Sequence, residues 1–246
     1  MDFTGFRVQG HSMVIIGLLT EILNSIADPE LEKLASEHVN LVMNTFYNPE
    51  LSIANENLHH DYSRIGGYED YMFPGHSVET LWMVMFEAIR IKNRDLFDEA
   101  VKRIRHYIEI GWDYVFEGFG DLHYWAFDGP DRTREKMYGT KSMWSHTELL
   151  IATLHILEYT GENWAKEWYE RVRKYAINAF DTDYGVWSQA VDRFGKDKKR
   201  KVVYNAKRKG NYHFPRYLIL NLLSIDRIIK NKGKITPFSQ LPVHPG

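Results

Sequence analysis

The sequence contains no cysteine, and this absence excludes several kinds of chemistry at once. Disulfide bonds, thiolate nucleophiles and cysteine-based zinc sites are all ruled out. The chain also has no apolar run near the roughly 18 residues that a membrane-spanning helix needs. Its first 20 residues have neither the basic start, the long apolar run nor the cleavage site of a signal peptide. We therefore expect a cytoplasmic protein that does not bind membranes.

A strong charge of one sign is also missing, because 31 Lys and Arg stand against 33 Asp and Glu. Without a basic field we expect no nucleic-acid partner, and a small molecule is the simplest ligand. A length of 246 residues suits one core, so we predict a single domain over 1–246 with an irregular tail at 232–246. Aromatic residues reach 14%, which fits either a sugar-binding cleft or large side chains wedged between helices.

Apolar residues recur at three- and four-residue spacing along most of the chain, which predicts α-helices. Short turns join most of these segments in pairs, so the expected fold class is all-α, built from helical hairpins packed side by side. The seven predicted helices span Met13–Ile26, Pro29–Phe46, Gly75–Lys92, Arg94–Tyr114, Lys141–Tyr159, Asn163–Phe180 and Phe214–Asn231.

Three longer segments separate the helix pairs and are rich in Gly, Asp and aromatic residues: Tyr47–Phe73, Glu117–Gly139 and Asp181–Tyr212. Connections of this length are uncommon in compact domains unless they are functional, so we expect them to carry the chemistry. In the last segment, Gly185–Val191 and Lys201–Ala206 alternate like strands, which predicts a short β-hairpin.

A histidine stands at the start of a predicted helix in the segment that begins at Pro74. Glu79 lies three residues after His76, on the same helix face, where its carboxylate could orient and polarise the imidazole. Histidine titrates nearest to neutral pH, so His76 is a candidate proton carrier. A helix start that simply carries a satisfied histidine is the alternative.

A second helix start combines His213 with Pro215 and Arg216. The proline favours a helix that begins at this point, which places the imidazole at the helix mouth. Arg216 could bind a carboxylate or a substrate oxygen, or form a surface ion pair of less than about 1 kcal/mol.

A third helix start holds Trp144, His146 and Glu148. A tryptophan and a carboxylate four residues apart on one face suit a sugar, since the ring can stack and the carboxylate can bind hydroxyl groups. A core tryptophan beside an exposed glutamate is the competing interpretation.

His76, Glu79 and His213 could also form a two-histidine, one-carboxylate metal site. No compact metal motif is present, however, and we predict no metal and no cofactor.

Together, Pro-Gly-His-x-x-Glu, Lys-x-x-Trp-x-His-x-Glu and Lys-Gly-x-Tyr-His-x-Pro-Arg resemble the motifs of the N-acylglucosamine 2-epimerase family. The resemblance implies an (α/α)6 barrel of helical hairpins around an open-chain sugar. It implies that His76 and His213 are the acid/base pair and that Glu79 supports His76. Trp144, His146, Glu148 and Arg216 would bind the substrate.

The reaction that the resemblance implies is removal of the proton next to the carbonyl, a cis-enediolate intermediate and return of the proton. Return to C2 gives epimerisation and return to C1 gives aldose–ketose isomerisation. The family usually has an aromatic residue where this chain has Arg208, which motivates the hypothesis of an acidic sugar. Family members are also longer, so the resemblance implies that about the first five helices of twelve are absent and that a homodimer or a missing N-terminal segment closes the barrel.

Two other function classes stay open from the residues alone. A glycoside hydrolase on a helical toroid would use paired carboxylates such as Glu79 and Glu148. A non-catalytic sugar-binding or interaction protein would keep the fold without the proton transfer.

Overall fold

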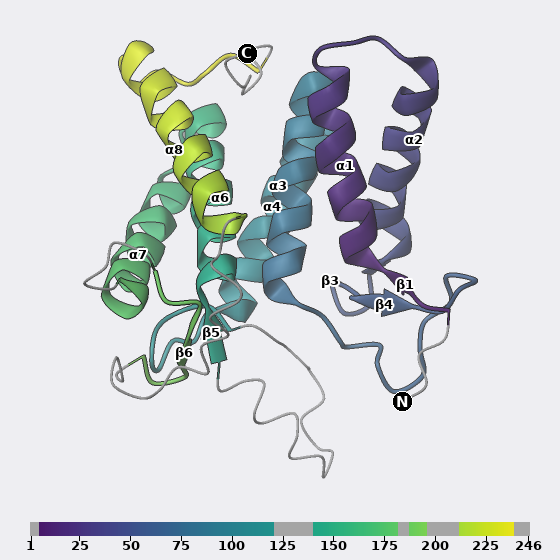
Figure 1. The fold of residues 1–246 in the computed structure, drawn as a ribbon, viewed down its shortest axis with the longest axis horizontal. Helices are drawn as coiled ribbons and strands as arrows, with labels where there is room; N and C mark the ends of the chain where they lie inside the picture. Colours follow the sequence, from purple (N-terminus) through teal and green to yellow (C-terminus); the bar gives the residue numbers. More distant parts are fainter. Residues whose placement is uncertain (1–4, 121–139, 182–186, 196–211, 239–246) are drawn as a thin grey trace.

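A computed structural model describes residues 5–120, 140–181, 187–195 and 212–238. The fold class is all-α, as predicted, and α-helices form hairpins with only small sheets between them (Figure 1). The α-helices of the described residues are α1 (Gln9–Leu23), α2 (Pro29–Asn40), α3 (Pro74–Arg90), α4 (Arg94–Gly111), α6 (Met143–Thr160), α7 (Asn163–Phe180) and α8 (His213–Lys230).

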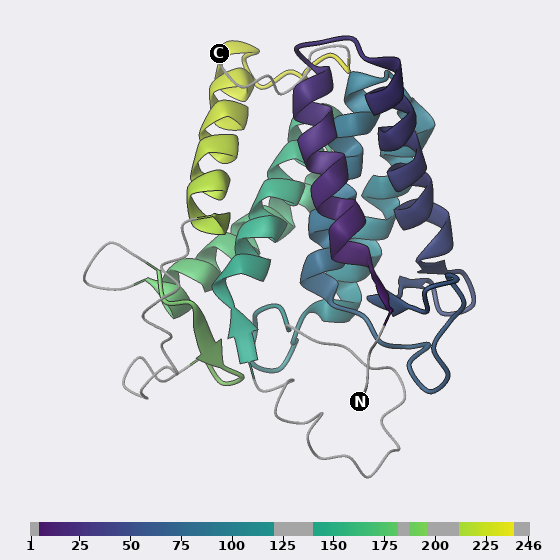
Figure 2. The ribbon, with the colours of Figure 1, turned by 45° about the vertical axis from the view of Figure 1, so that its right-hand side comes forward.

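The helices form two layers. Helices α1, α3, α6 and α8 are neighbours in that order and make an inner row, while α2, α4 and α7 each pack on the inner helix that precedes them. The inner helices run in the same direction, so their N-terminal ends face one side of the molecule (Figure 2). This is the inner and outer arrangement that the resemblance to an (α/α)6 barrel implies.

The pattern of buried residues explains the layers. Nearly every residue of α3 and α6 is buried, whereas α4 buries one stripe that includes Phe97, Ile104 and Ile108. A helix that is buried on nearly every side has neighbours on every side, whereas a helix with one apolar stripe needs neighbours on one side only. Helices α3 and α6 therefore lie in the middle of the row.

Local residues define where the helices begin and end. Asp28 accepts hydrogen bonds from the backbone N–H groups of Glu30 and Leu31 at 2.9 and 3.1 Å, and Pro29 occupies the first position of α2. Pro74 occupies the same position in α3. Helix α6 ends at Gly161, whose φ of 71° is left-handed and suits glycine.

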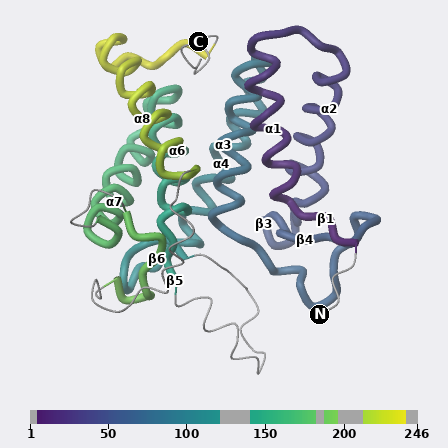
Figure 3. The backbone as a smooth tube through the Cα atoms, in the orientation of Figure 1, coloured from purple at the N-terminus to yellow at the C-terminus, as the bar shows by residue number. Residues whose placement is uncertain are grey.

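Short strands gather at the end where α1, α3 and α6 begin (Figure 3). The antiparallel pairs are β1 (Arg7–Val8) with β4 (Asn57–Leu58), β2 (Tyr47–Asn48) with β3 (Ile53–Ala54), and β5 (Thr140–Ser142) with β6 (Ala190–Asp192). A π-helical turn at Leu41–Thr45 follows α2. The pairs hold the long connections against the helix starts.

Some predicted boundaries were wrong for identifiable reasons. Helix α1 begins four residues before Met13, because β1 pairs with β4 and the N–H of Gln9 donates to the carbonyl of Glu56 at 2.9 Å. Lys141 belongs to β5 and not to the helix. In the predicted hairpin, the strand around Val191 pairs with β5, and its expected partner at 201–206 lies outside the described residues.

Within the predicted tail at 232–246, residues 232–238 form neither helix nor strand, and residues 239–246 are outside the described part. The segment is nevertheless anchored. The N–H of Thr236 donates to the carbonyl of Glu158 at 3.0 Å, and the ring of Phe238 lies 5.2 Å from that of Phe97. Among the helices that the structure describes, none combines the length and apolarity needed to cross a bilayer.

Candidate active site

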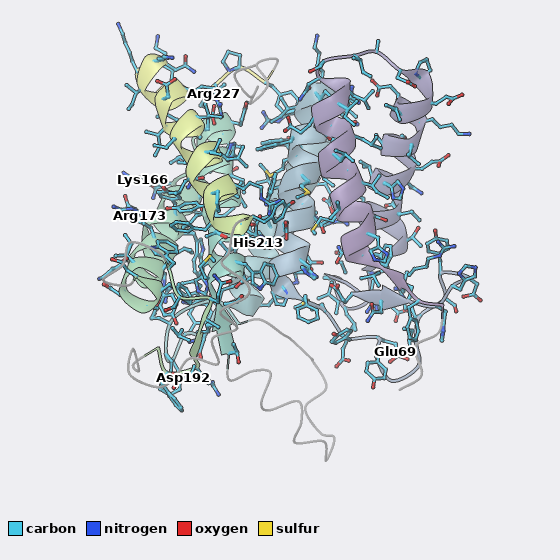
Figure 4. All side chains as sticks on the ribbon, in the orientation of Figure 1. Glu69, Lys166, Arg173, Asp192, His213 and Arg227 are labelled. Carbon is cyan, nitrogen blue, oxygen red and sulfur yellow. The ribbon has the colours of Figure 1, made fainter. Side chains whose placement is uncertain are left out.

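Three inner helices bring His76, Trp144 and His213 together at their first turns. His76 is the third residue of α3, Trp144 the second of α6 and His213 the first of α8. The Trp144 ring centroid lies 5.1 Å from that of His76 and 5.4 Å from that of His213. Figure 4 shows His213 near the centre of the molecule, whereas Lys166 and Glu69 lie at its edges. The structure thus gathers residues that are 137 positions apart, from 76 to 213, into one cluster.

His76 is paired with a carboxylate from the long connection that precedes its helix. Its Nδ1 lies 2.9 Å from Oε1 of Glu56, and its side chain is 31% exposed while that of Glu56 is 5% exposed. We predicted Glu79 for this contact. The prediction was wrong because the connection passes over the start of α3, where the N–H of Glu56 donates to the carbonyl of Tyr71 at 3.1 Å.

Two opposing effects act on the pKa of His76. Burial alone would lower the pKa, but the hydrogen bond to Glu56, with the negative charges of Glu56, Glu79 and Glu148, outweighs it and the pKa is raised. A raised pKa makes this imidazole a stronger base.

His213 has its own carboxylate partner. Nδ1 of His213 lies 2.8 Å from Oε1 of Glu148, and the side chain of His213 is 28% exposed while that of Glu148 is fully buried. Glu148 also accepts from Trp82 Nε1 at 2.8 Å and from Arg216 Nη2 at 2.7 Å. Burial acts to raise the pKa of Glu148, but the Arg216 charge and the His213 hydrogen bond outweigh it and the pKa is lowered. Glu148 is therefore an ionised partner of His213 and not the exposed glutamate of the competing interpretation.

Glu79 lies on the other side of Arg216. Its Oε1 also accepts from Arg216 Nη2, and its side chain is 1% exposed. Burial and the neighbouring charge of Glu148 raise the pKa of Glu79. Arg216 Nη1 donates to the hydroxyl of Tyr212 at 2.6 Å. Arg216 thus links α8 to α3 and α6 and neutralises part of the charge of two buried carboxylates.

The predicted substrate contact of His146 is wrong. His146 is fully buried, its Nδ1 donates to the carbonyl of Ser142 at 2.7 Å and its Nε2 accepts from the N–H of Phe119 at 2.9 Å. Burial lowers its pKa to about 3, which keeps the ring neutral. Both ring nitrogens are occupied, so His146 supports the loop at 111–120 and has no free atom for a ligand.

One group of described residues has the geometry of a metal site. Ligand atoms of Glu79, Glu148 and His213 lie within 4.8 Å of one another. Nη2 of Arg216 donates to both carboxylates, so a guanidinium already supplies the positive charge that a metal ion would bring. The group is better suited to the arginine guanidinium than to a metal ion.

A cavity of about 310 Å³ adjoins the cluster between α1, α3 and α8. Arg216 and Tyr212 line one part of it, and the other lining residues are mostly apolar, with Val14 and Leu18 from α1 and Trp82 from α3. The two paired histidines are not among the described lining residues. Arg216 therefore lies between the imidazole cluster and the cavity and contacts both.

Sequence reasoning missed three members of the cluster. Glu56 is 20 residues before His76 in a connection whose path no periodicity predicts. Trp82 lies in a helix that is buried on all sides, where an aromatic residue suggests only a place in the core. Tyr212 stands one helical turn before its partner Arg216, and this spacing is a signal in the sequence that could have identified the contact. Arg208 lies outside the described residues.

Comparisons with known proteins agree with the motifs and the fold. A profile of the family described as N-acylglucosamine 2-epimerase (GlcNAc 2-epimerase) matches residues 19–215. The N-acylglucosamine 2-epimerase of Rattus norvegicus is 26% identical over 178 residues, which are 70% of this chain and 40% of the rat protein. This chain thus spans less than half the length of that relative.

Among solved structures, a cellobiose 2-epimerase from Bacillus thermoamylovorans matches with a TM-score of 0.70 at 18% identity, over 88% of this chain and 52% of that chain. A D-mannose isomerase matches with a TM-score of 0.70 at 13% identity, over 93% of this chain and 56% of that chain. At these identities the structures show a shared fold. The profile covers most of the sequence, and the chain belongs to the N-acylglucosamine 2-epimerase family.

Proposed function

We propose that the histidine cluster epimerises a sugar at C2 or interconverts an aldose and a ketose, by proton transfer on the open-chain form. One observation carries this proposal. Two partly exposed imidazoles each place Nδ1 on a buried carboxylate, His76 on Glu56 and His213 on Glu148. An ionised carboxylate only accepts hydrogen bonds, so each Nδ1 is the donor and each neutral ring keeps a lone pair on Nε2.

In this proposal, Nε2 is the atom of each imidazole that takes up or donates the proton. One imidazole takes the C2 proton, the electron pair moves toward the carbonyl, and a cis-enediolate forms beside the new imidazolium. When the other imidazole is protonated on Nε2, it donates this proton to the opposite face of C2 and gives the epimer. When the first imidazolium returns the abstracted proton to C1, a proton also passes from O2 to O1 and the ketose forms. The N-terminal ends of α3, α6 and α8 meet at the cluster, and their partial positive charge favours the enediolate.

The other predicted residues take supporting roles in the proposal. Glu79 acts through Arg216, and Glu148 acts through His213. Trp144 and Arg216 are the proposed sugar contacts in the described part of the chain. An acidic sugar, suggested by Arg208, remains a hypothesis; it is refuted if neutral sugars bind the Arg208→Ala variant as well as the wild type and acidic sugars bind neither.

A glycoside hydrolase with Glu79 and Glu148 is a weaker candidate. Hydrolases place two carboxyl groups on either side of the bond that breaks, about 5 to 9.5 Å apart. Here both carboxylates accept from one nitrogen of Arg216, and both are buried. The guanidinium lies where the sugar would have to enter.

Apolar side chains on the outer flanks of the inner row bear on possible partners. On α8, Leu218, Leu222, Ile225 and Ile229 are between 38% and 69% exposed, and they recur at three- and four-residue spacing. Val14 and Leu18 are exposed on α1. We propose that further helices cover these flanks, from a second copy of this chain or from another segment. A cytoplasmic location is likewise part of the proposal.

The test is exchange of the C2 proton in deuterated water, followed by NMR with N-acetylglucosamine, cellobiose and mannose as probes. The proposal expects deuterium at C2, and His76→Ala or His213→Ala should each slow exchange by about 10²- to 10⁴-fold. His106→Ala is the control, since His106 lies on the outer helix α4. Bond cleavage would indicate a hydrolase, and binding without exchange would indicate a sugar-binding protein. Full activity in either histidine variant would refute its role.

A further inference from the structure

The aromatic rings of the cluster form a continuous chain across three helix starts. Phe73 lies 5.3 Å from His76, His76 lies 5.1 Å from Trp144, Trp144 lies 5.4 Å from His213, and Tyr212 lies 5.0 Å from His213, each measured between ring centroids. Trp144 is the member that contacts both imidazoles. Its position therefore limits how close the two rings can come and how they can turn.

The position of the Trp144 indole depends on a glycine in the neighbouring helix. A Cβ atom on Gly75 would lie 2.6 Å from Cη2 and 2.8 Å from Cζ3 of Trp144, and 2.9 Å from Cβ of Ser145. Carbon atoms pack at about 3.5 to 4.0 Å, so either the indole or the start of α6 would have to move. Gly75 has no left-handed φ that would explain a glycine there. The close approach of the indole is the reason that the structure offers.

We propose that Trp144 is a positioning residue, seated against Gly75, that sets the spacing and orientation of His76 and His213. This inference rests on the proposed function and adds a role for Trp144 besides contact with the sugar. Each imidazole is held by a carboxylate at Nδ1 and by the indole at its side. Two points of support define the direction of Nε2, and small errors in that direction are costly for proton transfer.

Gly75→Ala tests the proposal, because it adds one methyl group that displaces the indole. Gly10→Ala is a matched control: Gly10 is the second residue of inner helix α1, as Gly75 is of α3, and a Cβ there would meet no atom within 4 Å. The first readout is the NMR signal of the Cε1–H groups of His76 and His213, which the indole ring current displaces. Both signals should move in Gly75→Ala and neither in Gly10→Ala.

The second readout separates rate from binding. In Gly75→Ala, C2 exchange at saturating sugar should fall by up to about 10²-fold while the dissociation constant changes much less. Trp144→Phe is the second variant, because its smaller ring cannot reach both imidazoles. Circular dichroism checks that this variant is folded. Unmoved histidine signals, or a loss confined to the dissociation constant, would overturn the positioning role. A wild type that exchanges no sugar would instead refute the proposed function, and the NMR comparison would still decide the role of Trp144.

Discussion

His76 and His213 each contact a buried carboxylate, but the two carboxylates differ in their other hydrogen bonds. His76 faces Glu56, whose Oε2 has no hydrogen-bond partner among the described residues. His213 faces Glu148, whose charge is divided among His213, Arg216 and Trp82. A carboxylate with one donor supports its imidazolium more strongly than a carboxylate with three donors. The pKa of His76 is raised, and we therefore expect His76 to be the base that takes the C2 proton.

Glu56→Gln tests this asymmetry. The amide oxygen can still accept from Nδ1 of His76, but the negative charge that raises the pKa of His76 is gone. A base acts in its neutral form, so the rising limb of kcat/KM against pH should move to lower pH, and the maximal rate should fall because the base is weaker. Glu69→Gln, in an exposed position of the same connection, should leave the profile unchanged. A profile that stays in place in Glu56→Gln would contradict the assignment.

Two other histidines are buried in neutral form and make the protein sensitive to acid. Burial lowers the pKa of His146 to about 3 and that of His155 to about 4. In the unfolded chain both titrate near about 6.5, so the unfolded state binds more protons below that pH. The stability that they contribute is present above about pH 6.5 and is lost as the pH falls, at up to about 1.4 kcal/mol per pH unit for each histidine.

The corresponding measurement is the free energy of unfolding in urea between pH 7 and pH 5. His155→Leu should flatten the decline, because it removes one of the two neutral histidines without leaving an unpaired group. His11→Leu, on the exposed side of α1, serves as the control. An equal decline in the His155 variant and the wild type would show that His155 is not the group that takes up the proton.

At the scale of elements, one ion pair connects three inner helices. Arg216 from α8 donates to Glu79 from α3 and to Glu148 from α6, and all three side chains are at least 85% buried. Removing the cation leaves two buried carboxylates close together, and breaking a buried pair in this way costs about 3–5 kcal/mol. The helix starts that carry the histidines depend on this link.

Arg216→Met should therefore lower the free energy of unfolding by about 3–5 kcal/mol at neutral pH. Part of the loss should be recovered at lower pH, where Glu79 binds a proton, since its pKa is already raised. Lys230→Met is the matched change on the same helix: the pair of Lys230 with Asp226 is exposed and should contribute less than about 1 kcal/mol. Similar losses in the two variants, measured by urea unfolding, would argue against the central position of Arg216.

The elements were largely predictable from the sequence because helical periodicity is local. Asn163–Phe180 was predicted with its observed bounds, and Pro29 and Pro74 mark their helix starts directly. The partner of His76 was not predictable in the same way. Glu56 reaches it through β4 and a connection whose course depends on tertiary contacts, so the nearest carboxylate in sequence, Glu79, was a misleading guide.

The same distinction applies to His146. Its position beside Trp144 in the sequence suggested a shared role, but successive helical residues face different directions, and His146 points into the core toward Tyr175 and Phe180. The sequence of α6 does not show which positions are buried, because nearly all of them are, polar residues such as His146 and Glu148 included.

At the scale of the molecule, the described inner row has two free flanks. Leu222 and Ile229 of α8 are 66% and 69% exposed, which is unusual for large apolar residues at helical spacing. If a second copy covers this flank, Leu222→Glu should shift the protein from dimer to monomer in sedimentation velocity experiments. Val115→Glu, a change at a 75% exposed position in the loop after α4, should not. A wild type that is monomeric and binds no hydrophobic dye would contradict the proposed cover.

The order of the inner row has a consequence for motion. Helix α3, which carries His76, is flanked by α1 and α6, whereas α8, which carries His213, packs mainly on α6. His76 therefore lies on a helix that is held between two inner helices, and His213 lies on a helix that packs mainly against one. We therefore expect faster amide hydrogen exchange in α8 than in α3, and the difference should shrink when further helices cover the exposed face of α8.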